Sequence, residues 1–198
     1  MAKPEQTEQT TSRGQTTKPD QTAKPERELP ELKELAAHIA DRVWNHADLG
    51  AIDEYFLPHF VGHFPGLPDV YGPADFKKMG ADLRKALPDL QERILVQVQE
   101  RDRVFMQAVL TGTHRGDLMG IPPTGVATVL TEMIILRFEG RKVAELWQQA
   151  DYMGVMEQLG VVPPRDAGPL GQIAHTFKLM GRFGVLKAKD ALRQRSAA

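Results

Sequence analysis

Apolar residues in the first half of the chain recur every three or four positions, which is the spacing of amphipathic helices. Such a stripe begins near Leu29 and predicts a helix of roughly four turns. Residues 49–56 predict a second, short helix, and Pro73 suits the first turn of a third helix that ends at the LPDL sequence. The apolar positions of the first and third helices are Leu32, Leu35, Ala36, Ile39 and Val43, and Phe76, Met79, Leu83 and Leu87.

The second half of the chain changes to alternation of apolar and polar residues, which is typical of β-strands. Four strands are predicted over residues 93–99, 103–114, 128–138 and 142–151, and FVGHF (60–64) predicts a short earlier strand. Glu139-Gly140 predicts a tight hairpin between the last two strands, and residues 100–102 join the first two. A short helix is expected over residues 152–159, with Gly160 at its end.

Helices followed by an antiparallel meander are typical of the α+β class. We therefore expect a curved antiparallel sheet that packs against the N-terminal helices and encloses a conical cavity. This domain spans residues 29–163. Residues 1–28 repeat KPEQ, KPDQ and KPER with almost no apolar residues, and they predict a disordered tail.

Residues 164–198 predict a linker and an extra C-terminal helix that is both basic and amphipathic. Leu170, Ile173 and Phe177 belong to its apolar stripe, and Lys178 and Arg182 to its basic residues. Three alternatives remain open: packing on the domain or on a second subunit, contact with an anionic membrane, or binding of an acidic partner. Packing is favoured over membrane contact, because basic amphipathic helices on soluble folds more often dock on their own protein.

Composition narrows the classes of function. The 198 residues carry a formal net charge of −1, so nucleic acid is not an expected partner. The chain has no cysteine, which excludes disulfides, zinc–thiolate sites and thiol nucleophiles. No apolar run approaches the length of a membrane span, and the N-terminus lacks the apolar core of a secretory signal, so the expected location is the cytoplasm.

Alternation along the strands selects the candidate site residues. His114 ends the strand 103–114 on the same face as Met106 and Leu110. Trp147 and Asp151 share one face of the strand 142–151, although alternation leaves open which face points inward, and a bulge would invert it. Each residue also has an ordinary structural role: a hydrogen-bonded histidine for His114 and for His63, a core anchor for Trp147, and an N-cap of the helix 152–159 for Asp151.

Two long segments carry a resemblance to a known family. They read HRGDLMGIPPTG (114–125) and ILRFEGRKVAELWQQADYMGVMEQLG (135–160), and they combine a GIPPT turn with a W-x-x-x-D pattern followed by QLG. Two further segments share this resemblance: VWNHADLGAIDEYFLPHFVGHFPG (43–66) and ALPDL (86–90). The chain resembles, over about residues 35–163, the SnoaL-like polyketide cyclases, also called ester cyclases, of the nuclear-transport-factor-two-like and ketosteroid-isomerase-like superfamily.

The resemblance implies a cone-shaped α+β barrel and an intramolecular aldol ring closure without metal or organic cofactor. It implies Asp151 as the general acid/base, and we expect this residue close to His114 in one cavity. The ligand would be a small hydrophobic carbonyl compound. The residues expected to contact it are Trp147, Met106, Leu110, Met133, His63 and Tyr55. The chain departs from the family at Ile134, where related cyclases can carry a second polar group.

Two classes of function therefore compete. The first is an enzyme that cyclises, isomerises or dehydrates a hydrophobic carbonyl compound by proton transfer, and it is slightly favoured. The second is a non-catalytic module in which the same cone binds a small ligand or mediates oligomerisation. In either case we expect a homodimer or higher oligomer through the exposed face of the sheet, where Phe105 and Val109 would lie.

Overall fold

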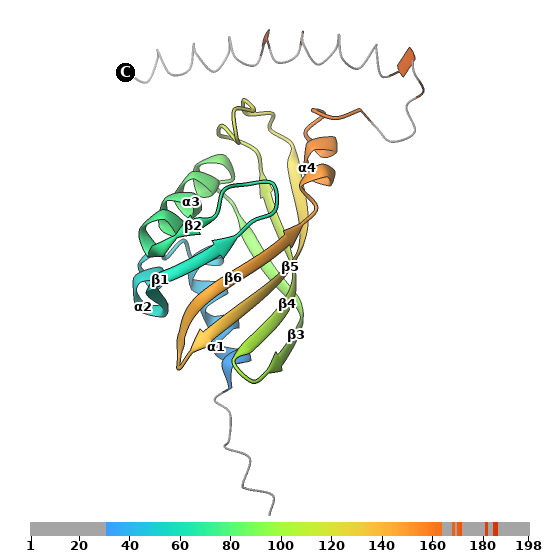
Figure 1. The fold of residues 1–198 in the computed structure, drawn as a ribbon. Helices are drawn as coiled ribbons and strands as arrows, with labels where there is room; N and C mark the ends of the chain where they lie inside the picture. The colour runs from blue at the N-terminus through green and yellow to red at the C-terminus, as the bar shows by residue number, and fades with distance from the viewer. Residues whose placement is uncertain (1–30, 164–167, 169, 172–180, 182–183, 186–198) are drawn as a thin grey trace, which may run out of the picture.

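A computed structural model describes residues 31–163 together with residues 168, 170, 171, 181, 184 and 185 (Figure 1). The predicted disordered tail, 1–28, and most of the predicted basic amphipathic helix in 164–198 lie outside the described residues. The domain predicted for 29–163 corresponds to a single sheet with helices packed on one of its faces.

The predicted helices form with nearly the expected bounds. They are α1 (Leu32–Ala40), which continues as one π-helical turn, η1 (Asp41–Asn45), then α2 (Gly50–Tyr55), α3 (Gly72–Ala86) and α4 (Tyr152–Gln158). The wider turn of η1 directs Asn45 onto the sheet, where its amide oxygen accepts from the backbone N–H of Glu92 at 2.7 Å. Within the described residues no helix has the length and hydropathy needed to cross a membrane.

The sheet has six strands in the order β2-β1-β6-β5-β4-β3. They are β1 (Phe56–His63), β2 (Val70–Tyr71), β3 (Gln91–Glu100), β4 (Arg103–Thr113), β5 (Ala127–Glu139) and β6 (Lys142–Ala150). The predicted antiparallel meander is confirmed from β3 to β6. The sheet as a whole is mixed and does not close, because β1 lies parallel to β6 and the edge strands β2 and β3 do not pair.

The hydrophobic core lies between the helices and one face of this sheet, which we call the covered face. Val104, Met106, Ile134 and Leu136 project from β4 and β5 onto the stripe of α1 that the sequence predicted. A smaller cluster under the end of α3 contains Ala86, Leu87, Leu90 and Leu110. The opposite face of β3–β6, the open face, has no helix packed on it in the described residues (Figure 1).

A bulge next to the β5–β6 hairpin settles which side chains of β6 point inward. The register shifts between Arg137 and Phe138, whose partners on β6 are Glu145 and Val143. Val143 and Ala144 are consequently both buried although they are neighbours. Beyond the bulge Leu146 is buried, whereas Trp147 pairs with Ile135 on the open face.

Candidate functional site

Two glutamates project from the sheet into the covered core. Glu92 of β3 is 7 % exposed and Glu132 of β5 is 4 % exposed. The register places Glu92 opposite Leu110 and Glu132 opposite Ala108, so the two flank β4 on the same face. Neither residue type is common in such a place, because an ionised carboxylate loses its hydration there. This pair is the most unusual polar feature of the described core.

Burial changes the titration of both carboxyl groups. Desolvation raises the pKa of Glu92 to about 8, and repulsion from Glu132 adds to the rise. Desolvation also raises the pKa of Glu132 to about 7, while a hydrogen bond from Gln148 opposes the rise. At pH 7 these values leave Glu92 mostly protonated and Glu132 about half ionised. A carboxylic acid and a carboxylate on one face of the core are groups that general acid–base catalysis uses.

Gln148 and Tyr152 connect this pair to α4. The side-chain amide of Gln148 donates from Nε2 to Oε2 of Glu132. The hydroxyl of Tyr152 donates to Oε1 of Gln148 at 2.5 Å. Burial raises the pKa of Tyr152 to about 12, so the hydroxyl remains a donor at physiological pH. Glu132 thus accepts a hydrogen bond from Gln148, which in turn accepts one from Tyr152.

Glu92 has no comparable support. Within the described residues, neither of its carboxyl oxygens has a hydrogen-bond partner. Glu92 lines a small cavity of about 30 Å³, whose other lining residues are apolar and come mainly from α1, η1, α3 and the neighbouring strands. A buried carboxyl group that faces a cavity without a partner is a site for a ligand polar atom.

His114 is fully buried at the end of β4, on the covered face as predicted. Its Nδ1 lies 3.0 Å from Oγ1 of Thr124, and burial lowers its pKa. Its backbone N–H donates to Val126 and its backbone C=O accepts from Gly125. These bonds close the loop between β4 and β5, whereas Nε2 of the His114 ring is buried without a hydrogen-bond partner in the described residues.

Asp151 is exposed and acts as the N-cap of α4, since its Oδ1 accepts from the backbone N–H of Gly154 at 2.9 Å. Its own N–H donates to Thr131, which pairs with Val109 on β4. His114 lies five residues beyond Val109, roughly 17 Å along the strand at the rise of an antiparallel strand. The expected proximity of Asp151 and His114 in one cavity is therefore wrong.

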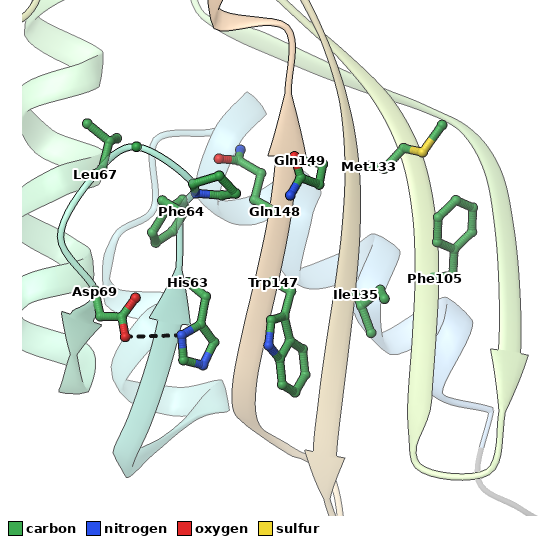
Figure 2. A pocket seen from close by; sticks show the side chains of 12 residues that line it. His63, Phe64, Leu67, Asp69, Phe105, Met133, Ile135, Trp147, Gln148 and Gln149 are labelled. Atoms are coloured by element: carbon green, nitrogen blue, oxygen red, sulfur yellow. Dashed lines mark ion pairs between the residues drawn. The ribbon is translucent and has the colours of Figure 1, made fainter.

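The open face carries a second group of predicted residues (Figure 2). His63 stacks on Trp147, with 5.5 Å between ring centroids, and its two nitrogens lie 3.2 Å from Asp69 and 3.0 Å from Glu145. The hydrogen bond with Glu145 is the main cause that raises the pKa of His63. His63, Asp69 and Trp147 line, together with Met133, an open depression of about 470 Å³.

The residues expected to contact one ligand therefore divide among separate places. Met106 lines the interior cavity, and Leu110 belongs to the cluster beneath α3. Met133, Trp147 and His63 lie on the open face, because the β6 bulge turns Trp147 outward. Tyr55 lies on α2, where its ring packs under the guanidinium of Arg42. Within the described residues, no group of three or more His, Asp or Glu side chains is arranged to hold a metal ion.

Sequence reasoning missed four residues of the interior group: Glu92, Glu132, Gln148 and Tyr152. The signal for Glu132 was present, because it stands at an inward position of β5 between Leu130 and Ile134. Glu132 lies two residues before Ile134 on the same face of β5. It therefore supplies a polar group on this strand, which the apolar Ile134 cannot do. Gln148 was hidden, because the strand alternation of β6 inverts at the bulge.

Comparisons with known proteins converge on one family. A family model of the SnoaL-like polyketide cyclases matches residues 34–159. Nogalonic acid methyl ester cyclase of Streptomyces nogalater is 27% identical over 119 residues, which are 59% of this chain and 89% of that protein.

Two solved structures extend this likeness. AclR of Streptomyces galilaeus, a candidate hydroxylase, is 32% identical with a TM-score of 0.61, covering 67% of this chain and 98% of its own. A candidate polyketide cyclase from Acidithiobacillus ferrooxidans is 30% identical with a TM-score of 0.59. The match covers 65% of this chain and 93% of that chain.

Two substitutions of Asp151 distinguish its role as a helix cap from a role in acid–base chemistry. Asp151→Ala removes the acceptor for Gly154 and is expected to lower the free energy of unfolding by about 1 kcal/mol. Asp151→Asn keeps a good cap and is expected to retain both stability and turnover. Urea denaturation and a turnover assay check this. A folded Asp151→Asn protein without turnover would restore Asp151 as the acid/base.

Glu92 makes stability depend on pH. Its pKa is raised from 4.5 to about 8, so the folded protein holds this proton more tightly than the unfolded chain does. The contribution of neutral Glu92 to stability is complete below pH 4.5 and is lost as the pH rises through about 8. Glu92→Gln removes this loss, so its stability should fall less between about pH 5 and about pH 9.

Urea unfolding across this range measures the effect. Glu100→Gln, on the exposed end of the same strand, is the matched control and should follow the unmodified protein. Equal slopes for the Glu92→Gln and Glu100→Gln proteins would contradict the assignment of a raised pKa to Glu92.

Proposed function

Since the chain belongs to the SnoaL-like polyketide cyclase family, we propose that it is an enzyme that cyclises a small hydrophobic carbonyl compound by proton transfer at Glu132 and Glu92. The observation that carries this proposal is the buried carboxyl pair, in which both groups exchange a proton near neutral pH. Glu92 lines the interior cavity, and strongly perturbed carboxyl groups beside a cavity are typical of proton-transfer sites.

The roles of the two carboxyl groups follow from their surroundings. Glu132, which accepts from Gln148, is the carboxylate and serves as the base that removes a proton from the carbon next to a substrate carbonyl. Glu92, protonated and without a partner, donates a hydrogen bond to the carbonyl oxygen. This bond becomes stronger as negative charge develops on that oxygen in the enolate.

The ring closure balances without an external reagent. The electrons of the broken C–H bond form the enolate, and its carbon attacks a second carbonyl of the same substrate to make the new C–C bond. The alkoxide that results takes back the proton held by Glu132. The apolar lining contributed by the helices keeps water away from the enolate.

The substrate must widen the interior before it reaches the pair. The cavity of about 30 Å³ has the volume of one water molecule in the liquid. Trp44 of η1 borders this cavity and packs edge-on against Phe76, so its displacement is the expected entry step. The π-helical turn that carries Trp44 is a form of helix that occurs frequently at functional sites.

Nogalonic acid methyl ester, the compound in the name of the related cyclase, is the probe for this function. We expect the protein to form a cyclised product and, in D₂O, to exchange the hydrogen at the reacting carbon, both followed by mass spectrometry. Glu132→Gln should lower the rate by about 100-fold or more, because it removes the base. Glu92→Gln should lower it as well, and Tyr71→Phe, far from the pair on β2, is the control.

The outcomes decide between the enzyme and a non-catalytic module. Binding of the probe with neither exchange nor product would overturn the enzyme proposal and favour the module. Exchange without ring closure would retain proton transfer and exclude this compound as the substrate. Equal rates for the Glu132→Gln and unmodified proteins would remove Glu132 from the reaction.

We also propose that a second copy of the chain covers the open face. One register row crosses five strands of this face with Val98, Phe105, Ile135, Trp147 and His63. Val98 is 54% exposed and Ile135 is 38% exposed. From strand spacing and rise the face of these strands measures roughly 800 Å², which matches one side of a standard protein interface.

The charges beside this apolar row are compensated within the chain. Arg137 pairs with Glu145 at 3.0 Å and with Glu139 at 2.9 Å. A copy placed on this row therefore meets Arg137, Glu145 and Glu139 as paired rather than isolated charges. A two-fold dimer, in which the same surface meets itself, suits such a face.

Ile135→Lys should convert the dimer to a monomer, because it places a charge in the middle of the apolar row. Size-exclusion chromatography with light scattering measures the mass. Met119→Lys, a change at a residue that is 68% exposed in the loop after β4, is the control and should remain dimeric. A monomeric unmodified protein, or an Ile135→Lys protein that remains dimeric, would refute the interface.

A further inference from the structure

The hydrogen bonds that reach the buried pair all point in one direction. The hydroxyl of Tyr152 donates to Oε1 of Gln148, and Nε2 of Gln148 donates to Oε2 of Glu132. Glu132 stands at the end of this series as an acceptor, and an ionised carboxylate is acceptor-only. The carboxyl group of Glu92 receives no hydrogen bond from the described residues. The two carboxyl groups are therefore not equivalent.

The orientation of the Gln148 amide is what distinguishes them. An amide with its nitrogen toward Glu132 favours the carboxylate, whereas an amide with its oxygen toward Glu132 favours the protonated acid. In the second orientation the nitrogen of Gln148 would donate to Tyr152. That orientation would break the hydrogen bond that the hydroxyl of Tyr152 donates to Oε1 of Gln148. Tyr152 thereby selects the first orientation.

We propose that Tyr152 is a positioning residue: it fixes the amide of Gln148, favours the ionised form of Glu132 and so makes Glu132, rather than Glu92, the first of the pair to lose its proton. This inference deepens the proposed function, because it determines which glutamate is the base and which is the acid. It remains testable without any substrate, because the location of the proton is a property of the free protein.

No other charged group competes for this role among the described residues that face the pair. The helices and β1 face the cavity beside Glu92 with apolar side chains such as Ile39 and Phe76. From β4 the neighbour is Ala108, and from β6 it is Gln148, neither of which titrates. Glu92, Glu132 and Tyr152 are thus the titrating groups of the site.

The anchoring of α4 explains why Tyr152 can hold the amide in place. Asp151 caps the helix directly before Tyr152, and Leu159 at its other end is fully buried. Gln158 also donates to and accepts from the backbone of Val129 on β5. The hydroxyl of Tyr152 is consequently held in place relative to β6. Less conformational entropy is then lost when the side chain of Gln148 is ordered.

The experiment is a pH titration of the glutamate side chains by carbon-13 NMR of protein labelled at the glutamate carboxyl carbons. The signals of Glu92 and Glu132 are assigned by their absence from Glu92→Gln and Glu132→Gln proteins. In the unmodified protein we expect Glu132 to ionise at a lower pH than Glu92. In Tyr152→Phe the midpoint of Glu132 should rise by about one pH unit, the effect of weakening one hydrogen bond to the carboxylate. Tyr71→Phe, which removes a hydroxyl on β2, should leave both midpoints unchanged.

A second variant tests whether Tyr152 acts through Gln148. Gln148→Met should also raise the midpoint of Glu132, and adding Tyr152→Phe to it should cause no further rise. The inference is overturned if Glu92 ionises before Glu132 in the unmodified protein. It is equally overturned if Gln148→Met shifts Glu132 and Tyr152→Phe does not. If the variants shift the titration as expected but the protein shows no turnover, the proposed function alone is refuted. If turnover depends on Glu132 but Tyr152→Phe leaves the titration of Glu132 unchanged, this inference alone is refuted.

Discussion

One extra residue in β6 determines what each face of the sheet can do. The register shift beside Arg137 buries both Val143 and Ala144, and beyond it the alternation of β6 is inverted. Gln148 then donates to the buried Glu132, while Trp147 stacks on His63 at the open face. With regular alternation from Val143, Trp147 and Glu145 would have entered the core instead. The polar network in the core and the apolar row outside both depend on this bulge.

The buried glutamates impose a cost that packing alone does not explain. Removing two carboxyl groups from water is unfavourable, and only Glu132 recovers a hydrogen bond from the described residues. Apolar residues at both positions would make a more stable core. The raised pKa values show the physical result of this cost, because each carboxyl then exchanges a proton near neutral pH. The proposed proton transfer would give this cost a function.

Much of the fold was predictable because local patterns determine it. The helical stripe from Leu32, the four strands of the meander and the turns at Gly140 and Gly160 are confirmed. The parallel pairing of β1 with β6 was not predictable, because it joins segments about 80 residues apart that share no turn. The inward face of β6 was ambiguous for a local reason, since consecutive apolar residues at Val143 and Ala144 fit either alternation. Glu132 could have been found from the alternation of β5, whereas the role of Tyr152 depends on how α4 turns back over the sheet.

The position of Asp151 gives the W-x-x-x-D pattern a physical meaning that differs from a catalytic carboxylate. The aspartate fixes the first turn of α4 through the N–H of Gly154, where a Cβ atom would lie 2.3 Å from its Oδ2. Because that turn begins with Tyr152, the same cap determines where the tyrosine hydroxyl meets Gln148, four residues earlier. An exposed side chain at the strand end can thus influence the buried pair through geometry alone. Gln148, Asp151 and Tyr152 form one unit, in which the helix cap and the orientation of the Gln148 amide depend on each other.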